Sequence, residues 1–193
     1  MAKRIILGSG ELFRTDFTPG MTIADPETYC LEANRFSHIK GGASLEYAQE
    51  KQKEEDDLGL VSKTRINTES AKLKGGLMTL DGGSMKYLAA TATDPESIAA
   101  VENTSVAKKK TKIGGIKNEV ETPYLWIFHH EDKVDGDIWI IVAGTHNAAL
   151  NIEFKKDGAN VSNLEVDAIP LDSDGHKVYY YEEVKGTTPT TTN

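Results

Sequence analysis

The side chains best suited to chemistry are two adjacent histidines followed by two acids. His129 and His130 precede Glu131 and Asp132, and all four are residue types that bind metal ions. Neighbouring side chains on a strand point to opposite faces, so the two histidines cannot hold one ion together. The five histidines contain no H-x-H or H-x-x-x-H spacing. We therefore predict the end of a strand that enters a polar turn, with no metal site.

A second candidate is the run Asp-Ser-Asp-Gly at 172–175, which matches part of a calcium-binding loop. With Gly175 in the sixth position of such a loop, Pro170 takes the first position and Tyr181 the twelfth. Neither residue can supply the carboxylate that the loop needs. Because Asp-Gly is a strong signal for a tight hairpin, we predict a turn here.

Motifs for nucleotide binding and for nucleophilic catalysis are missing from the sequence. It contains neither a G-x-x-x-x-G-K-[ST] phosphate loop nor a G-x-S-x-G nucleophile turn. The single cysteine, Cys30, is predicted to be a small buried apolar side chain that makes no disulfide. We predict that the protein is not an enzyme and uses no cofactor.

Composition excludes several further classes of protein. The 193 residues carry a net charge of −8, whereas a duplex DNA binder normally has a basic surplus. The longest apolar run, Ile138–Ala143, is far shorter than the roughly twenty residues of a membrane-spanning helix. One cysteine suits a reducing compartment, and the three apolar residues Ile5–Leu7 are too few for a signal peptide. We expect no specific nucleic-acid binding and no membrane partner.

Two oppositely charged segments are the candidate assembly sites. The polar residues from Gln49 onward have no apolar stripe, and we predict an extended charged loop or hairpin over 49–70. Its candidate contact residues are Glu50, Glu54, Glu55, Asp56, Asp57 and Leu58. The possible partner patch is the basic run Lys108, Lys109, Lys110 and Lys112.

The remaining patterns predict a mainly β domain over 1–184 with one or two short helices. A helix at 82–91 should cover the sheet through Met85, Leu88 and Ala89. Further short helical turns are expected after Asp25 and after Asp94, each of which precedes a proline.

The last third of the chain reads as an antiparallel meander, and two of its strands are apolar on both faces. These runs, Leu125–Phe128 and Ile138–Val142, need cover on each face from the helix and from either a second sheet or neighbouring subunits. The Thr/Pro-rich residues 185–193 are expected to be a disordered tail.

Two stretches carry a resemblance to a known family. They are Gly-Gly-Ala-Ser-Leu-Glu-Tyr at 41–47 and Ala-Ile-Pro-Leu-Asp-Ser-Asp-Gly at 168–175. With the polar excursion and the helix between them, the chain resembles the major tail tube proteins of long-tailed (siphovirus-like) bacteriophages over most of residues 3–184. The resemblance implies a β-sandwich or small barrel flanked by a helix, with a long loop that reaches the next subunit.

The resemblance also implies a function and partners. Six copies would form a ring, and stacked rings would form a tail tube through which DNA passes. The other implied partners are the tape measure, tail terminator and distal tail proteins, and the implied location is the virion tail, assembled in the host bacterial cytoplasm. Two alternatives stay open: a tube subunit of a phage-like bacteriocin or contractile injection system, and a β-sandwich module that binds carbohydrate or protein.

Overall fold

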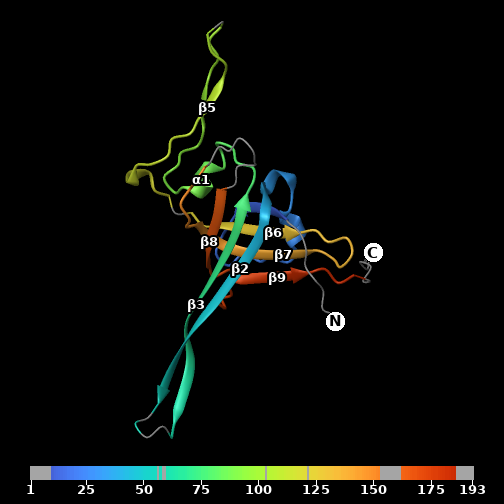
Figure 1. Cartoon of the computed structure of the whole chain (residues 1–193), viewed down its shortest axis with the longest axis vertical. Coiled ribbons are helices and arrows are strands. Elements are labelled where there is room, and N and C mark those ends of the chain that lie inside the picture. Colours follow the sequence, from blue (N-terminus) through green and yellow to red (C-terminus); the bar gives the residue numbers. More distant parts are fainter. Residues whose placement is uncertain are drawn as a thin grey trace.

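The protein is mainly β, as the sequence predicts, with one large antiparallel sheet (Figure 1). The computed structural model describes residues 10–55, 57, 60–102, 104–120, 122–152 and 162–185. The strands of the large sheet are β1 (Glu11–Asp16), β2 (Arg35–Glu55), β3 (Ser62–Leu77), β6 (Tyr124–His130), β7 (Ile138–His146), β8 (Ser162–Ile169) and β9 (Val178–Glu182). The remaining elements are β4 (Glu96–Ile98), β5 (Lys108–Lys110), helix α1 (Met85–Leu88) and the 3-10 turns η1 (Pro26–Tyr29), η2 (Glu32–Asn34) and η3 (Ile116–Asn118).

Six strands of the large sheet close into a barrel. The order β6-β1-β2-β3-β8-β7 returns to its start because β7 also pairs with β6. On the other edge of β7, β9 pairs with Ile138–Val142 and β8 pairs with Ala143–His146. A closed sheet leaves fewer unpaired strand edges than an open one, so closure limits edge-to-edge association of the barrel.

The interior of the barrel holds one of two hydrophobic cores. Its centre is Trp126, which is fully buried and donates a hydrogen bond from Nε1 to the carbonyl oxygen of Gly144 at 3.1 Å. The ring of Phe36 meets Trp126 edge-on, with centroids 5.1 Å apart. Leu88 of α1 belongs to this core and is 3% exposed.

The second core lies on the outer face of β1, β6 and β7, and the chain itself covers it. Phe17 and Ile23, which follow β1, pack there with Leu125 and Ile141. The turn η1 holds this segment in shape, because Asp25 accepts a hydrogen bond from the backbone N–H of Glu27 at 2.9 Å. Both faces of β6 and β7 are therefore covered within one chain: the barrel interior covers one face and the segment after β1 covers the other. The sequence had led us to expect a second sheet or neighbouring subunits in this role.

The helical segments differ in part from the sequence-based expectation. The helix expected over 82–91 is a single turn, Met85–Leu88, and the backbone is extended again at Ala89. Leu88 is buried as expected, whereas Met85 and Ala89 are only half-buried. The helical turn expected after Asp94 is wrong, because the chain forms strand β4 there and pairs with β5.

Two hairpins project from opposite ends of the barrel (Figure 1). The long hairpin, residues 46–70, is the outer part of β2 and β3, and the short hairpin, residues 96–110, is formed by β4 and β5. In the part of the chain that the structure describes, no helix is long and apolar enough to cross a membrane. Of the tail expected at 185–193, all but Lys185 lies outside the described residues.

Candidate assembly surfaces

The long hairpin is a regular ribbon that leaves the barrel at a glycine pair. Gly41 and Gly42 both have φ above +80°, which side chains with a Cβ rarely adopt, and the β2–β3 register shifts between Ile39 and Ala43. Beyond this bulge the described residues Glu46–Glu55 and Ser62–Thr68 are all exposed. The ribbon therefore presents both of its faces to the surroundings.

The acidic residues of the long hairpin do not form one patch. Glu54 and Glu55 are neighbours on a strand, so they point to opposite faces. Glu54 lies 3.6 Å from Arg65, and Glu55 lies 2.5 Å from Lys53. Each acid thus has a base beside it on the same hairpin.

Other members of the predicted assembly loop are placed as follows. Glu50 accepts a hydrogen bond from the Thr68 hydroxyl at 2.9 Å. Asp57 is exposed near the tip. Asp56 and Leu58 lie outside the described residues.

The basic run on the short hairpin is divided in the same way. Lys108 pairs with Ile98 and Lys110 with Glu96 in the β4–β5 register, which puts Lys109 on the opposite face. Lys112 contacts Glu96 at 2.5 Å, and this hydrogen bond lowers the pKa of the Glu96 carboxyl. The acids of the long hairpin and these lysines lie at opposite ends of the molecule, so within one chain they do not meet (Figure 1).

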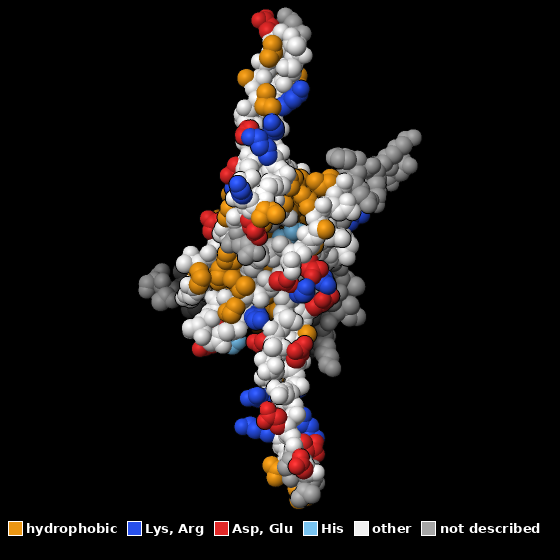
Figure 2. All heavy atoms as spheres, turned by 90° about the vertical axis from the view of Figure 1, so that its left-hand side faces the viewer, with side chains coloured by type: hydrophobic (Ala, Val, Ile, Leu, Met, Phe, Trp, Pro, Cys, Tyr) orange, Lys and Arg blue, Asp and Glu red, His pale blue; other side chains and the backbone are white. Residues whose placement is uncertain are grey.

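Exposed aliphatic side chains near both hairpin tips were not singled out from the sequence. Leu60 is 80% exposed and adjoins the exposed Val61 on the long hairpin. On the short hairpin Val106 is 73% exposed, and Ile98 and Val101 are also exposed. Figure 2 shows hydrophobic side chains at each end of the molecule. In the sequence, these aliphatic residues stand close to charged and polar neighbours.

An ion-pair network anchors the base of the long hairpin on β8. The ammonium of Lys72 lies 2.7 Å from Glu165 and 3.1 Å from Asp167. Hydrogen bonds to Glu165 and then Asp167 raise the pKa of Lys72 to about 12. A lysine held in its protonated form is a poor nucleophile, so the cluster ties β3 to β8 and does not form a reactive site.

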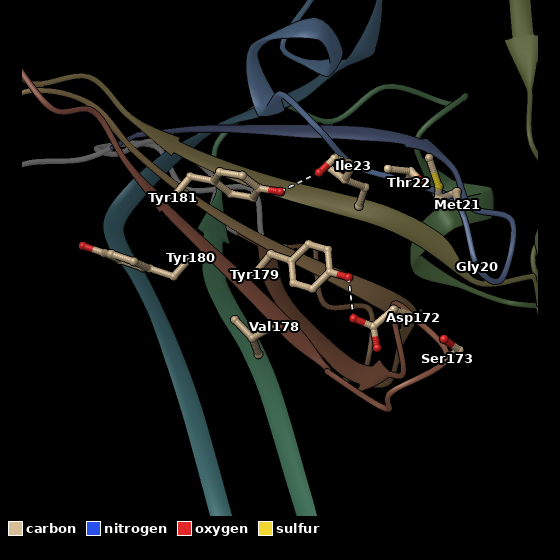
Figure 3. Close-up of a pocket in the computed structure, with 10 residues that line it drawn as sticks. All are labelled: Gly20, Met21, Thr22, Ile23, Asp172, Ser173, Val178, Tyr179, Tyr180 and Tyr181. Carbon is tan, nitrogen blue, oxygen red and sulfur yellow. Dashed lines mark hydrogen bonds between the residues drawn. The ribbon is translucent and has the colours of Figure 1, made fainter. Parts of the chain in front are cut away.

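A groove of about 700 Å³ opens between Gly20–Ile23 and strand β9 (Figure 3). Tyr179 and Tyr181 point toward this segment, while Tyr180 points to the other side of the strand. The Tyr181 hydroxyl donates to the carbonyl oxygen of Ile23 at 2.7 Å.

The Asp172 carboxylate of the groove already has hydrogen-bond partners. Tyr179 donates to the Asp172 carboxylate at 2.6 Å, which lowers the pKa of Asp172 and raises the pKa of Tyr179 to about 12. His176 also bonds to that carboxylate, at 2.7 Å. The groove therefore offers aromatic faces for binding, and its carboxylate, whose pKa is lowered, is a weak base.

The side chains of the two adjacent histidines point to opposite faces of β6, because successive side chains on a strand alternate between its two faces. His129 bonds to Asp137 at 2.8 Å and stacks on Trp139, while His130 is buried. Among the described residues, no group of three or more His, Cys, Asp or Glu is arranged to hold a metal ion. Burial raises the pKa of the Cys30 thiol to about 12, which keeps it protonated.

No known protein family matches the chain, and no curated protein matches it at a significant level. The features that bear on function are therefore the two hairpins and the groove.

Proposed function

We propose that the protein is a structural virion subunit that forms stacked hexameric rings, which make the tail tube of a long-tailed bacteriophage. The observation that carries the proposal is the pair of exposed hairpins at opposite ends of a closed barrel (Figure 1). The ring of six copies, the passage of DNA and the virion location come from the sequence resemblance alone.

The exposed ribbon of the long hairpin supports assembly. An isolated two-stranded hairpin is at best marginally stable in water, and this one has no apolar face that its own barrel covers over Glu46–Glu55. A contact with another copy would bury part of it. Contacts between different surfaces at the two ends of a subunit repeat along one axis, which is how a stack of rings grows.

Net charge also suits a conduit for DNA. The chain carries −8 at neutral pH, and a wall of like sign does not bind phosphates during passage. The tape measure, tail terminator and distal tail proteins are the further partners proposed for such a tube. The virion tail, assembled in the host cytoplasm, is the proposed location.

Electron microscopy of the concentrated protein tests the proposal. We expect rings or hollow tubes whose number rises with concentration, together with a matching sedimentable fraction. A protein that stays monomeric by light scattering at every concentration and salt condition would contradict it. A bacteriocin or contractile injection system would use the same kind of tube, and a co-purifying sheath protein would distinguish it.

A β-sandwich or barrel module that binds carbohydrate is a second candidate, favoured by the tyrosine-lined groove. Aromatic faces such as those of Tyr179 and Tyr181 can pack on the apolar faces of sugars. Soluble oligosaccharides should then raise the melting temperature, and Tyr179→Ala should remove that shift. A melting temperature unaffected by a broad oligosaccharide panel would count against this function.

A further inference from the structure

Aspartate followed by glycine occurs at three places among the described residues: Asp81–Gly82, Asp135–Gly136 and Asp174–Gly175. A fourth such pair, at 157–158, lies outside them. In each pair the backbone nitrogen of glycine can attack the carboxyl carbon of the preceding side chain, because the chain itself holds the two groups close together. Glycine also has no Cβ to obstruct the approach.

The reaction needs no co-reactant other than water. A C–N bond forms, a C–O bond breaks, and the amide proton leaves with the carboxyl hydroxyl as water, which closes a five-membered succinimide ring. Water then adds to either carbonyl carbon and opens the ring. One opening restores aspartate, and the other leaves isoaspartate, in which the backbone runs through the former side chain. The rate depends on how freely the turn can move and on how much of the carboxyl is neutral.

Gly175 has more space around it than the other two glycines. Apart from its two chain neighbours, no described residue has an atom within 4 Å of a Cβ built on Gly175. A Cβ built on Gly136 would lie 3.0 Å from the carbonyl oxygen of Glu183. One built on Gly82 would lie 2.9 Å from Oγ1 of Thr111. The turn at Gly175 can therefore adjust to the attack without meeting a neighbouring segment.

The backbone nitrogens also differ in how firmly they are held. The N–H of Gly136 donates to the carbonyl oxygen of Asp132 at 2.8 Å. The N–H of Gly175 donates to the carbonyl oxygen of Asp172 at 3.3 Å, which is beyond the length of roughly 3.2 Å that limits most such bonds. The weaker bond leaves the nitrogen of Gly175 freer to move toward the carboxyl carbon of Asp174.

The carboxyl of Asp81 is held by hydrogen bonds of its own. Its Oδ1 accepts from the backbone N–H and from the hydroxyl of Ser84, both at 2.7 Å. These bonds lower the pKa of Asp81, so a smaller fraction of the carboxyl is neutral at a given pH. Asp81 therefore presents less of the reactive form, in addition to the crowding at Gly82.

We propose that Asp174–Gly175 is a modification site at which isoaspartate forms spontaneously, faster than at the other two described Asp-Gly pairs. The turn combines open space with a weakly held nitrogen, and neither of the other pairs has both. Such a modification lies outside the proposed assembly function, and it needs no second copy of the chain.

Isoaspartate at position 174 changes one end of the tyrosine-lined groove. The Asp172 carboxylate accepts hydrogen bonds from the backbone N–H of His176 at 3.0 Å and from the Tyr179 hydroxyl at 2.6 Å (Figure 3). The modification puts one extra backbone atom between Asp172 and His176, so this N–H cannot keep its place against the carboxylate. The turn that positions the groove carboxylate is therefore altered.

Incubation of the full chain in water labelled with heavy oxygen tests the proposal. Each ring opening inserts one heavy oxygen atom, whichever product forms, and digestion in ordinary water followed by mass spectrometry locates it. In the folded protein we expect label to appear about tenfold faster at Asp174 than at Asp135 or Asp81. In urea the three rates should become similar, because unfolding removes the differences in space and in hydrogen bonding.

Asp174→Glu is the matched variant, because its longer side chain has to close a six-membered ring, which forms more slowly. Label at this position should then fall to background, while Asp135→Glu should leave the label at Asp174 unchanged. Label that appears first at Asp135 or Asp81, or equally at all three, would overturn the assignment. A preference for Asp174 that persists in urea would also overturn it, because the preference would then come from sequence neighbours and not from the folded turn.

Hydrogen exchange measures the effect on the groove. In protein aged until isoaspartate has accumulated, the backbone amide of His176 should exchange about tenfold faster than in fresh protein. Aged Asp174→Glu should exchange like its own fresh form. Unchanged exchange at His176 in the modified protein would refute the effect on the groove.

Discussion

The closed barrel predicts that one glycine cannot be replaced by alanine. Gly144 lies on β7 where that strand pairs with Ala168 of β8. A Cβ added at Gly144 would lie well inside van der Waals contact with the carbonyl oxygen of Asp167 and 3.0 Å from Val166 Cγ1. The nearest obstacle is backbone, so a side-chain rotation cannot relieve it, and Gly144→Ala must push β7 and β8 apart.

The expected loss of stability follows from the β7–β8 strand pairing, called the seam below, that Gly144→Ala disturbs. Overpacking of this kind costs about 1–3 kcal/mol, and each backbone hydrogen bond weakened along the seam adds about 1 kcal/mol. The β7–β8 seam contains only the pairs from Ala143 to His146, so one or two weakened bonds affect much of it. We expect a loss of about 2–5 kcal/mol in the free energy of unfolding, or roughly 10 °C in melting temperature.

Circular dichroism melting and urea unfolding of Gly144→Ala measure this loss. Gly83→Ala is the matched control, because the nearest atom to its added Cβ is Oδ1 of Asp81 at 3.4 Å, an ordinary contact. The control should stay within about 0.5 kcal/mol of the original protein. Equal melting temperatures for the two variants would refute the closure of the barrel at β7 and β8.

Three further outcomes are expected. Leu88→Ala should cost about 2–4 kcal/mol in urea unfolding, with a smaller loss for the half-buried Met85→Ala, and equal losses would contradict the packing of α1. Because the pKa of Asp172 is lowered in the folded protein, its carboxylate stabilises the fold above the unfolded pKa of about 4, and this stabilisation is lost as the pH falls through the folded pKa. Asp172→Asn should therefore flatten the acid part of a plot of stability against pH, and an unchanged profile would count against this role. Reversal of Glu54 and Glu55 to lysine should leave the melting temperature unchanged, since exposed ion pairs contribute about 0–1 kcal/mol, but should slow tube growth at low salt. Reversal of Lys108–Lys110 to glutamate in the same chain should partly restore growth if the tips meet, and growth like that of the original protein in the first variant would identify the acids as a solvated face.

Local patterns in the sequence were enough to predict the strands of the large sheet and some of the turns. The β-branched and aromatic runs near Leu125 and Ile138 form strands, because those side chains suit a pleated surface that is buried on both sides. Asp25 with Pro26 starts a short 3-10 turn, because the cap and the proline act within one turn of chain. These signals depend only on near neighbours.

The candidate surfaces could be predicted only in outline. The polar excursion was recognisable from its lack of an apolar stripe, but its acids divide between two faces once β2 and β3 pair. Which residues share a face depends on strand alternation, and a segment without hydrophobic periodicity gives no sign of that alternation. The exposure of the aliphatic residues near the hairpin tips depends on the barrel, which leaves them uncovered.

Tertiary structure alone decided how β6 and β7, which are apolar on both faces, are covered, and where short elements such as α1 and β4 begin and end. The chain composition required cover for β6 and β7, and the closed barrel together with the segment around Phe17 and Ile23 provides it. Asp94 starts no helix because the returning segment pairs with β4. Sequence determines which residues must be buried, because burial preference belongs to each side chain. Pairing between Ala143 of β7 and Ile169 of β8 depends on how separate segments of the chain come together, and near neighbours in the sequence do not specify it.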